Sequence, residues 1–239
     1  IIFFSVSELR VVLLGNSWSE RSSVGNFILG ETAFNTEEEP DCCQRFTGHL
    51  KKKEIVLINT PDLLHYNISE HKLIENVKNC VSLSNPGPHV FLLVLQPEDF
   101  TEEQKLKLCR VLQLFIDQSF DHSLVLISAP REESSGSIEN YMQHPPLGDM
   151  IRICEYRLLL QKNLELDELL TRFSQIVKEN NGDHVICDVF EDTKSDLTSG
   201  LGSLKQGETD SVRLDPFRAA VAIKSHTPSP VESTTNQSK

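Results

Sequence analysis

Basic residues are scarce in this sequence, and long apolar runs are missing. The 23 lysine and arginine residues are outnumbered by 35 aspartate and glutamate residues, which gives a formal net charge of -12. We therefore expect no basic face for a nucleic-acid backbone, and no nucleic acid among the partners. No run approaches the roughly 18 apolar residues of a membrane-spanning helix, so no transmembrane segment is predicted in this chain.

The cysteines also lack the spacing of a metal site. Six cysteines are scattered along the chain without a C-x-x-C pair, so we predict no zinc site. Cys80, Cys109 and Cys154 fall within apolar or helical patterns, which is typical of reduced thiols in a protein core. Reduced thiols favour a cytoplasmic location. Any association with internal membranes would depend on regions that this chain does not contain.

Short apolar runs alternate along the chain with helical patterns. Buried strands are predicted at 9–14, 54–59, 90–95, 123–127 and 156–160, with a candidate edge strand at 44–50. Helices are predicted at 22–29, 69–84, 101–119, 147–154 and 164–180, and 128–146 is predicted to be a loop. Leu106, Cys109, Leu112, Leu114 and Phe115 are expected to face inward from the long helix.

This alternation predicts an α/β fold. We expect a mostly parallel sheet with helices on both faces, a three-layer sandwich, and the glycine-turn pattern from Gly15 to Ser22 makes it P-loop NTPase-like. The domain is predicted to span residues 8–191, after an N-terminal stub at 1–7. The composition of residues 192–239 shifts to Ser, Thr, Gly, Pro and charged residues, so this tail is predicted to be disordered.

The stretch from Leu9 to Gly30 has the order of a phosphate-binding loop: strand, glycine turn, polar loop and helix. In the motif G-x-x-x-x-G-K-[ST], Gly15 takes the first glycine and Ser22 the hydroxyl position that binds magnesium. Arg21 replaces the lysine, and Glu20 stands where the second glycine should permit close backbone approach. The predicted nucleotide-binding residues are Gly15, Asn16, Ser17, Trp18, Ser19, Glu20, Arg21, Ser22 and Ser23. The alternative is a strand-to-helix turn that binds nothing.

Three further motifs make the sequence similar to a known family. They are VGNFILG at 24–30, GPHVFLLVLQPEDFTE at 87–102 and NNG at 180–182. With the loop above, they resemble the AIG1-type G domain of the immune-associated GTP-binding (GIMAP) proteins. The resemblance implies a GTP-binding domain that takes GTP or GDP with Mg²⁺ and assembles into homo- or hetero-oligomers through the G domain.

Several positions depart from that family's pattern. NTPD at 59–62 stands where the family has DTPG, so Asn59 loses the charge that holds magnesium and Asp62 places a carboxylate near the γ-phosphate. Cys42 takes the position of the switch threonine and is a poor magnesium ligand. The nearby acidic run 37–39 is expected to be a solvated loop in preference to a repulsive lid.

Base recognition is the least preserved element. The guanine-binding aspartate of the family aligns with Arg131, Glu132 or Glu133, depending on the register, and the sequence leaves these three open. Asn163 falls on one of the family's asparagines, so Glu132 and Asn163 are the base-binding candidates.

The sequence therefore predicts a GTP-binding protein of the GIMAP type that acts as a nucleotide-dependent switch or scaffold. Its phosphate loop is degenerate, its Mg²⁺ binding is weakened at Ser22, and it has no predicted catalytic residue. It is at most a weak GTPase. The alternative is a nucleotide-free pseudo-GTPase that acts as a protein-interaction module.

Overall fold

The computed structural model describes residues 6–50, 53–131 and 137–186, and it shows one six-stranded sheet. The strand order is β2-β3-β1-β4-β5-β6. All neighbouring pairs are parallel except β2 with β3, which is antiparallel. The strands are β1 (Glu8–Gly15), β2 (Gln44–Leu50), β3 (Lys53–Asn59), β4 (Val90–Leu95), β5 (Ser123–Ile127) and β6 (Leu158–Leu160).

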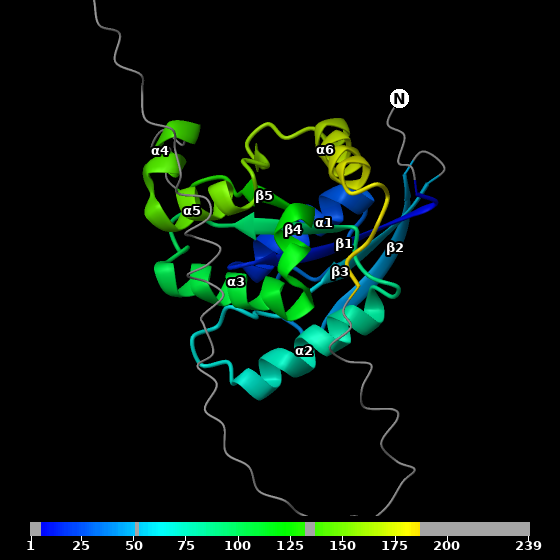
Figure 1. Ribbon diagram of the computed structural model, residues 1–239, viewed down its shortest axis with the longest axis horizontal. Helices are drawn as coiled ribbons and strands as arrows, with labels where there is room; N and C mark the ends of the chain where they lie inside the picture. The colour runs from blue at the N-terminus through cyan, green and yellow to red at the C-terminus, as the bar shows by residue number, and fades with distance from the viewer. Residues whose placement is uncertain (1–5, 51–52, 132–136, 187–239) are drawn as a thin grey trace, which may run out of the picture. The chain divides into compact units, whose positions relative to one another are not determined.

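Helices cover both faces of this sheet (Figure 1). They are α1 (Trp18–Leu29), α2 (Glu70–Leu83), α3 (Glu102–Phe115), α4 (Ile138–Gln143), α5 (Pro145–Ile153) and α6 (Leu166–Glu179), with a 3₁₀ helix η1 (Asp117–His122). One core cluster joins α1 and α6 to alternate residues of the strands. Helices α2 and α3 pack against each other over the opposite face. The predicted three-layer α/β sandwich is therefore confirmed.

Some element boundaries differ from the prediction, each for a local reason. Helix α3 ends at Phe115, because Ile116 is extended (φ -168°, ψ 156°) and separates it from η1. The predicted loop at 128–146 contains α4, whose first turn is capped where the Ser137 side chain accepts from the Asn140 N–H. Leu106 was predicted to face inward, and this is wrong: it is 46% exposed, and Leu108 and Val111 are buried instead.

No helix in the described residues is long and apolar enough to cross a membrane. The predicted domain boundary near residue 191 and the predicted disordered tail lie outside the described residues.

Strand β1 lies at the centre of the topology. The chain adds β3 on one side of β1 and β4 on the other, so the strand order reverses there. In open parallel sheets, ligands bind beyond the carboxyl ends of the strands at such a reversal. The predicted phosphate loop follows β1 directly, so it lies at this point.

Candidate functional site

The turn after β1 is much shorter than a phosphate loop. Gly15 has a φ of +151°, and a Cβ atom there would lie 1.8 Å from the carbonyl oxygen of Val94, so only glycine fits. Helix α1 already begins at Trp18, and its first backbone bond runs from the Arg21 N–H to the Ser17 carbonyl at 3.1 Å. Residues 18–20, predicted to wrap a phosphate, thus form the first turn of a helix.

Asn16 ties this turn to the neighbouring strand. Its Oδ1 accepts from the Gln96 N–H at 2.8 Å, and its Nδ2 donates to the Gln96 carbonyl at 3.0 Å. The remaining polar side chains of the turn are less constrained. Ser17 Oγ and Ser19 Oγ are 3.3 Å apart, and Ser23 is exposed. The amide of Asn16 is therefore committed to holding the end of β4.

Arg21 is buried completely at the carboxyl ends of β1 and β3. Its Nη1 donates to the Gly15 carbonyl, and its Nη2 donates to the Thr60 carbonyl at 3.1 Å. Glu39 Oε1 lies 3.8 Å from Nη2. Burial lowers the pKa of Arg21 to about 10, while the charges of Glu39 and Asp62 oppose that shift. The guanidinium thus already has carbonyl and carboxylate partners from the chain itself.

Ser22 and Asn59, the two residues at the predicted magnesium position, are uncharged and hydrogen-bonded to each other. Asn59 Nδ2 donates to Ser22 Oγ at 3.1 Å, and both side chains are fully buried. Asn59 Oδ1 has no hydrogen-bond partner. Magnesium prefers carboxylate oxygens and water, and this pair offers an amide and a hydroxyl only. The described residues contain no group of three or more His, Cys, Asp or Glu side chains that could hold a metal. The donor set therefore suits Mg²⁺ poorly.

Two carboxylates stand beside Arg21. Asp62 Oδ1 accepts from the Leu64 N–H at 3.0 Å, which caps the turn after β3. Burial raises the pKa of Glu39, while Arg21 and the backbone N–H of Asp62 lower it. Residues 37–39 form an exposed loop, as predicted, and Glu39 in addition lies 3.8 Å from Arg21 Nη2. The acidic run was visible in the sequence, but its contact with the site was not.

Arg131, one of the three residues that align with the guanine-binding aspartate, forms an exposed ion pair with Asp99. Arg131 Nη1 donates to Asp99 Oδ1 at 3.1 Å, Nη2 pairs with the other oxygen, and the Arg131 N–H donates to Glu98 Oε1 at 3.0 Å. Asp99 raises the pKa of Arg131, and Glu98 and Glu20 add to this. Glu132 lies outside the described residues. Asn163 has a left-handed backbone (φ 65°) in the turn after β6.

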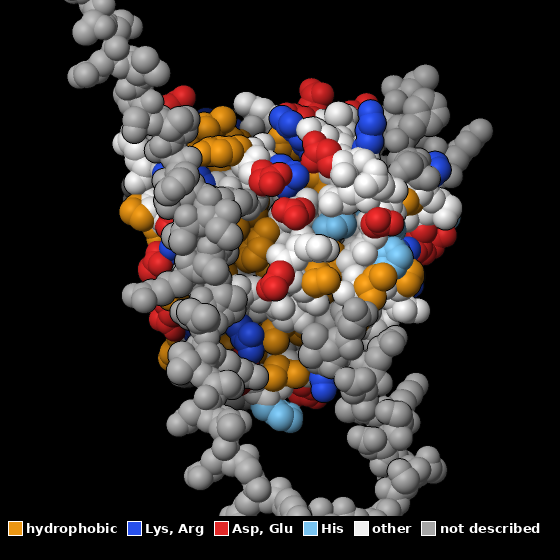
Figure 2. Space-filling view, viewed as in Figure 1, with side chains coloured by type: hydrophobic (Ala, Val, Ile, Leu, Met, Phe, Trp, Pro, Cys, Tyr) orange, Lys and Arg blue, Asp and Glu red, His pale blue; other side chains and the backbone are white. Residues whose placement is uncertain are grey.

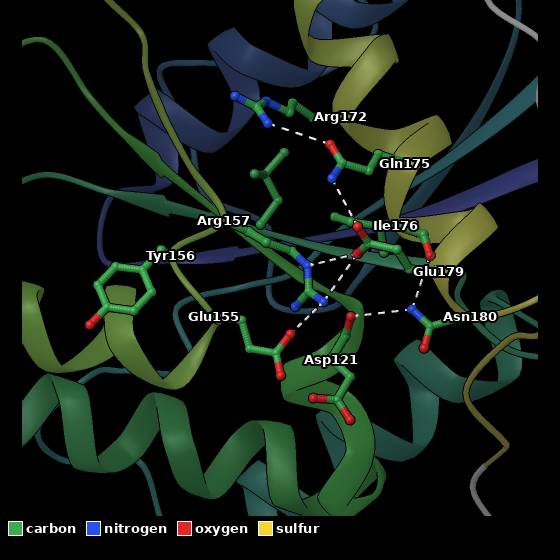
Figure 3. A pocket seen from close by; sticks show the side chains of 10 residues that line it. Asp121, Glu155, Tyr156, Arg157, Arg172, Gln175, Ile176, Glu179 and Asn180 are labelled. Carbon is green, nitrogen blue, oxygen red and sulfur yellow. Dashed lines mark hydrogen bonds and ion pairs between the residues drawn. The ribbon is translucent and has the colours of Figure 1, made fainter. Parts of the chain in front are cut away.

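A hollow lies at the opposite edge of the sheet, where β5 and β6 begin (Figure 3). It measures about 480 Å³. Arg157 crosses it and pairs with Glu155 at 2.8 Å and Glu179 at 3.2 Å. Acidic side chains also stand among basic ones over the middle of the face in Figure 2. Because its central charges neutralise each other, this hollow offers no distinct ligand chemistry.

Comparison with known proteins gives the family. A sequence model of the AIG1 family matches residues 9–202. GTPase IMAP family member 8 of Homo sapiens is 26% identical over 221 residues, which cover 84% of this chain and 33% of the human protein. Immune-associated nucleotide-binding protein 9 of Arabidopsis thaliana is 25% identical over 205 residues, 78% of this chain and 60% of that protein. The chain thus spans about a third to three fifths of these two relatives.

Solved structures support the fold. Toc33 from Arabidopsis thaliana in complex with GDP and Mg²⁺ has a TM-score of 0.61 at 16% identity, over 77% of this chain and 89% of Toc33. Era in complex with MgGDPNP and 16S ribosomal RNA has a TM-score of 0.51 at 16% identity, over 72% of this chain and 57% of Era. These likenesses show a P-loop GTPase fold. Since the family match covers most of the chain, the chain belongs to the AIG1 family.

Proposed function

We propose that this chain is a pseudo-GTPase: it keeps the AIG1 G-domain fold as a protein-interaction module and does not hydrolyse GTP. The observation that carries this proposal is the buried guanidinium of Arg21. Its Nη1 and Nη2 atoms donate to the Gly15 and Thr60 carbonyls and Nη2 faces Glu39, so most of this cation's contacts are made within the chain. A nucleotide phosphate would have to displace the Glu39 carboxylate and compete with the two carbonyls for this guanidinium.

Charge also opposes a nucleotide phosphate. Glu39 and Asp62 both act on Arg21 through their charges, so both carboxylates lie near the group that should attract phosphate. A like-charge pair at about 4 Å with an effective dielectric of about 20 costs about 4 kcal/mol before screening by water. The backbone adds to this penalty, because the turn of 18–20 has become helical and cannot wrap a phosphate.

Hydrolysis lacks its usual groups. Phosphoryl transfer depends on a bound metal and on a residue that positions the attacking water. Ser22 and Asn59 bond to each other and carry no charge. Leu63 and Leu64, which follow the NTPD motif, are buried and apolar. Nothing in this part of the site polarises a water molecule or neutralises the charge of the transition state.

The second candidate is a guanine-nucleotide-dependent switch or scaffold with weak hydrolysis or none. One observation favours it: Ser17, the N-cap of α1, makes no side-chain capping bond, so the N-terminal N–H groups of α1 stay open to an anion. The relative GTPase IMAP family member 8 and the complex of Toc33 with GDP and Mg²⁺ support it by analogy. This candidate would take GTP or GDP, with Mg²⁺ bound weakly at Ser22.

The two candidates are separated by thermal melting of the full chain. GTP, GDP and ATP are added with and without Mg²⁺, and a ligand at 100 times its dissociation constant should add about 2.7 kcal/mol of stability. We expect no shift with any nucleotide. A saturable shift with GDP supports the second candidate. Mg²⁺-dependent GTP turnover at the rate of a competent GTPase would overturn both.

The proposed partners are other proteins, including copies of this chain or of related G domains. Dimerization is important for the GTPase activity of the structural neighbour Toc33, which supports an interaction through the G domain by analogy. We also propose a cytoplasmic location. Cys43, Cys80 and Cys109 are buried cysteines outside any disulfide in the described residues, which suits a reducing compartment.

A further inference from the structure

Three buried polar atoms without hydrogen-bond partners belong to residues at the start of α1 and the end of β3, where the phosphate site was predicted. They are the donors Trp18 Nε1 and Arg21 Nε and the acceptor Asn59 Oδ1. The Arg21 guanidinium carbon lies 5.7 Å from the centre of the Trp18 ring, so the two donors belong to one neighbourhood. Buried donors in native proteins almost always find an acceptor. A buried guanidinium with an unpaired Nε–H, beside the unpaired Nε1–H of Trp18, suits a small oxyanion.

The Glu39 carboxylate faces Arg21 and could serve as this acceptor, but it forms no hydrogen bond with the guanidinium. The distance from Glu39 Oε1 to Arg21 Nη2 is 3.8 Å, longer than a hydrogen bond, and the Glu39 side chain remains 37% exposed. An ion pair that is half in water and not hydrogen-bonded contributes little. The Glu39 carboxylate can therefore be displaced by an anion that makes the missing hydrogen bonds.

Glu39 interacts with the same groups that would contact the terminal phosphate of a nucleotide. Arg21 occupies the position of the lysine that reaches the outer phosphates. Asp62, at the end of the NTPD motif, also acts on Glu39: its carboxylate raises the pKa of Glu39, and its backbone N–H lowers it. A cation and this backbone N–H are the two groups that should meet a terminal phosphate. Here both act on the carboxylate of Glu39.

We propose that Glu39 is a built-in substitute for an oxyanion, and that its removal exposes a site at Trp18 and Arg21 for a free oxyanion such as pyrophosphate. This inference rests on the proposed pseudo-GTPase function, because it explains why the parent chain needs no nucleotide. The ligand is a small oxyanion and not a nucleotide, since Arg131, which aligns with the guanine-binding aspartate in one register, carries the wrong charge for a base contact and pairs with Asp99.

The test uses the single tryptophan of the chain, which lies in the site. Tryptophan fluorescence of the full-length Glu39→Gln variant is titrated with sodium pyrophosphate. Glu38→Gln is the matched control, because it removes the same charge one residue away from an exposed side chain. We expect saturable binding to Glu39→Gln with a dissociation constant at least tenfold lower than for the parent chain or the control.

A second pair of variants assigns the gain to the site. Adding Arg21→Met to Glu39→Gln should abolish pyrophosphate binding in a melting assay. Glu39→Asp shortens the carboxylate by one methylene and should bind with intermediate affinity, which keeps the test usable if Glu39→Gln is poorly folded.

The outcomes separate this inference from the proposed function. Folded Glu39→Gln and Glu39→Asp variants without saturable binding would overturn the role of Glu39 and leave the pseudo-GTPase proposal standing. Equal gains in Glu39→Gln and Glu38→Gln would also overturn it, since they would reflect net charge alone. GDP binding by the parent chain would overturn the pseudo-GTPase proposal, whatever the variants do.

Discussion

Asn59 Nδ2 donates to Ser22 Oγ across 3.1 Å, and both side chains are fully buried. This contact joins the end of β3 to α1 at the place where a magnesium-binding pair was expected. Because neither partner carries a charge, the contact is stable without a metal. A negative charge introduced at Asn59 should therefore make this contact depend on a metal ion.

Asn59→Asp should make the stability of the chain depend on Mg²⁺. A buried carboxylate without a counter-ion is unfavourable, so we expect a loss of about 1–3 kcal/mol in metal-free buffer. Millimolar Mg²⁺ should restore part of it by binding to the folded state. Asn76→Asp is the control, since Asn76 is also buried but lies on α2. An equal Mg²⁺ response in both variants, measured by urea unfolding, would contradict the assignment.

Arg21→Met should destabilise the domain even though it removes a buried charge. The carbonyl oxygens of Gly15 and Thr60 would each lose their donor, and an unpaired buried polar group costs about 1–3 kcal/mol. We expect a total loss of about 2–4 kcal/mol in urea unfolding. Arg21→Lys keeps the charge but not the fork geometry, so its loss should be intermediate. A fully stable methionine variant would show that the guanidinium is not structural.

His89 should make the stability depend on pH. Its Nδ1 accepts from the Arg10 N–H at 3.0 Å, and the ring lies 5.9 Å from that of His184. Burial lowers the pKa of His89 to about 3, and Arg10, His184 and His122 add repulsion. Burial likewise lowers the pKa of His122 and of His184. In the folded chain these histidines are therefore protonated only at lower pH than in the unfolded chain.

The sign follows from linkage. Above about pH 6.5 the histidine is neutral in both states, so its contribution to stability is complete. As the pH falls from 6.5 to 5, only the unfolded state is protonated, and His89 alone should cost about 2 kcal/mol. We expect the free energy of unfolding to fall over this range. His89→Gln should flatten the profile, and an unchanged slope in that variant would contradict the explanation.

The sequence predicted the fold because its signals are local. The apolar runs of β4 and β5 have the predicted boundaries, and so has the edge strand β2. Local signals fail where a charged residue faces inward. Lys105 is buried between Glu102 at 2.7 Å and Asp149 at 2.9 Å, which turns Leu106 outward. Sequence periodicity does not predict that Lys105 is buried, because its partner Asp149 is distant in sequence.

The candidate site was also predicted only as far as local sequence signals reach. The substitutions at Glu20, Arg21, Asn59 and Asp62 were visible in the sequence, and they indicated a weakened phosphate site. The contact of Glu39 with Arg21 was not visible, because it depends on how a loop packs over the end of the sheet. Asn16 was likewise assigned to nucleotide, while its amide bonds to the backbone of Gln96. Sequence reasoning identified the altered residues but not their new partners.

The turn before β6 should be improved by glycine. Glu155 and Tyr156 are consecutive residues with left-handed backbone, at φ values of 55° and 59°. That conformation is unfavourable for a bulky residue, and the Tyr156 side chain is 66% exposed, so little burial offsets the strain. Tyr156→Gly should raise the free energy of unfolding by about 0.5–1 kcal/mol. Tyr66→Gly, at a more exposed tyrosine without positive φ, should not, and equal effects would contradict the strain.

Gly87 should tolerate no side chain. Its φ is +146°, and a Cβ atom would lie 1.9 Å from the carbonyl oxygen of Val185, where the chain after α6 bonds back through the Val185 N–H to Pro88 at 2.8 Å. Gly87→Ala must therefore push that segment away, and we expect a loss of about 3 kcal/mol or more. Gly30→Ala is the matched control, because Gly30 also has positive φ (+71°) but nothing within 4 Å of its Cβ position. Its loss should be about 1 kcal/mol from backbone strain alone. Equal losses in thermal unfolding would mean that the contact with Val185 adds nothing beyond that strain.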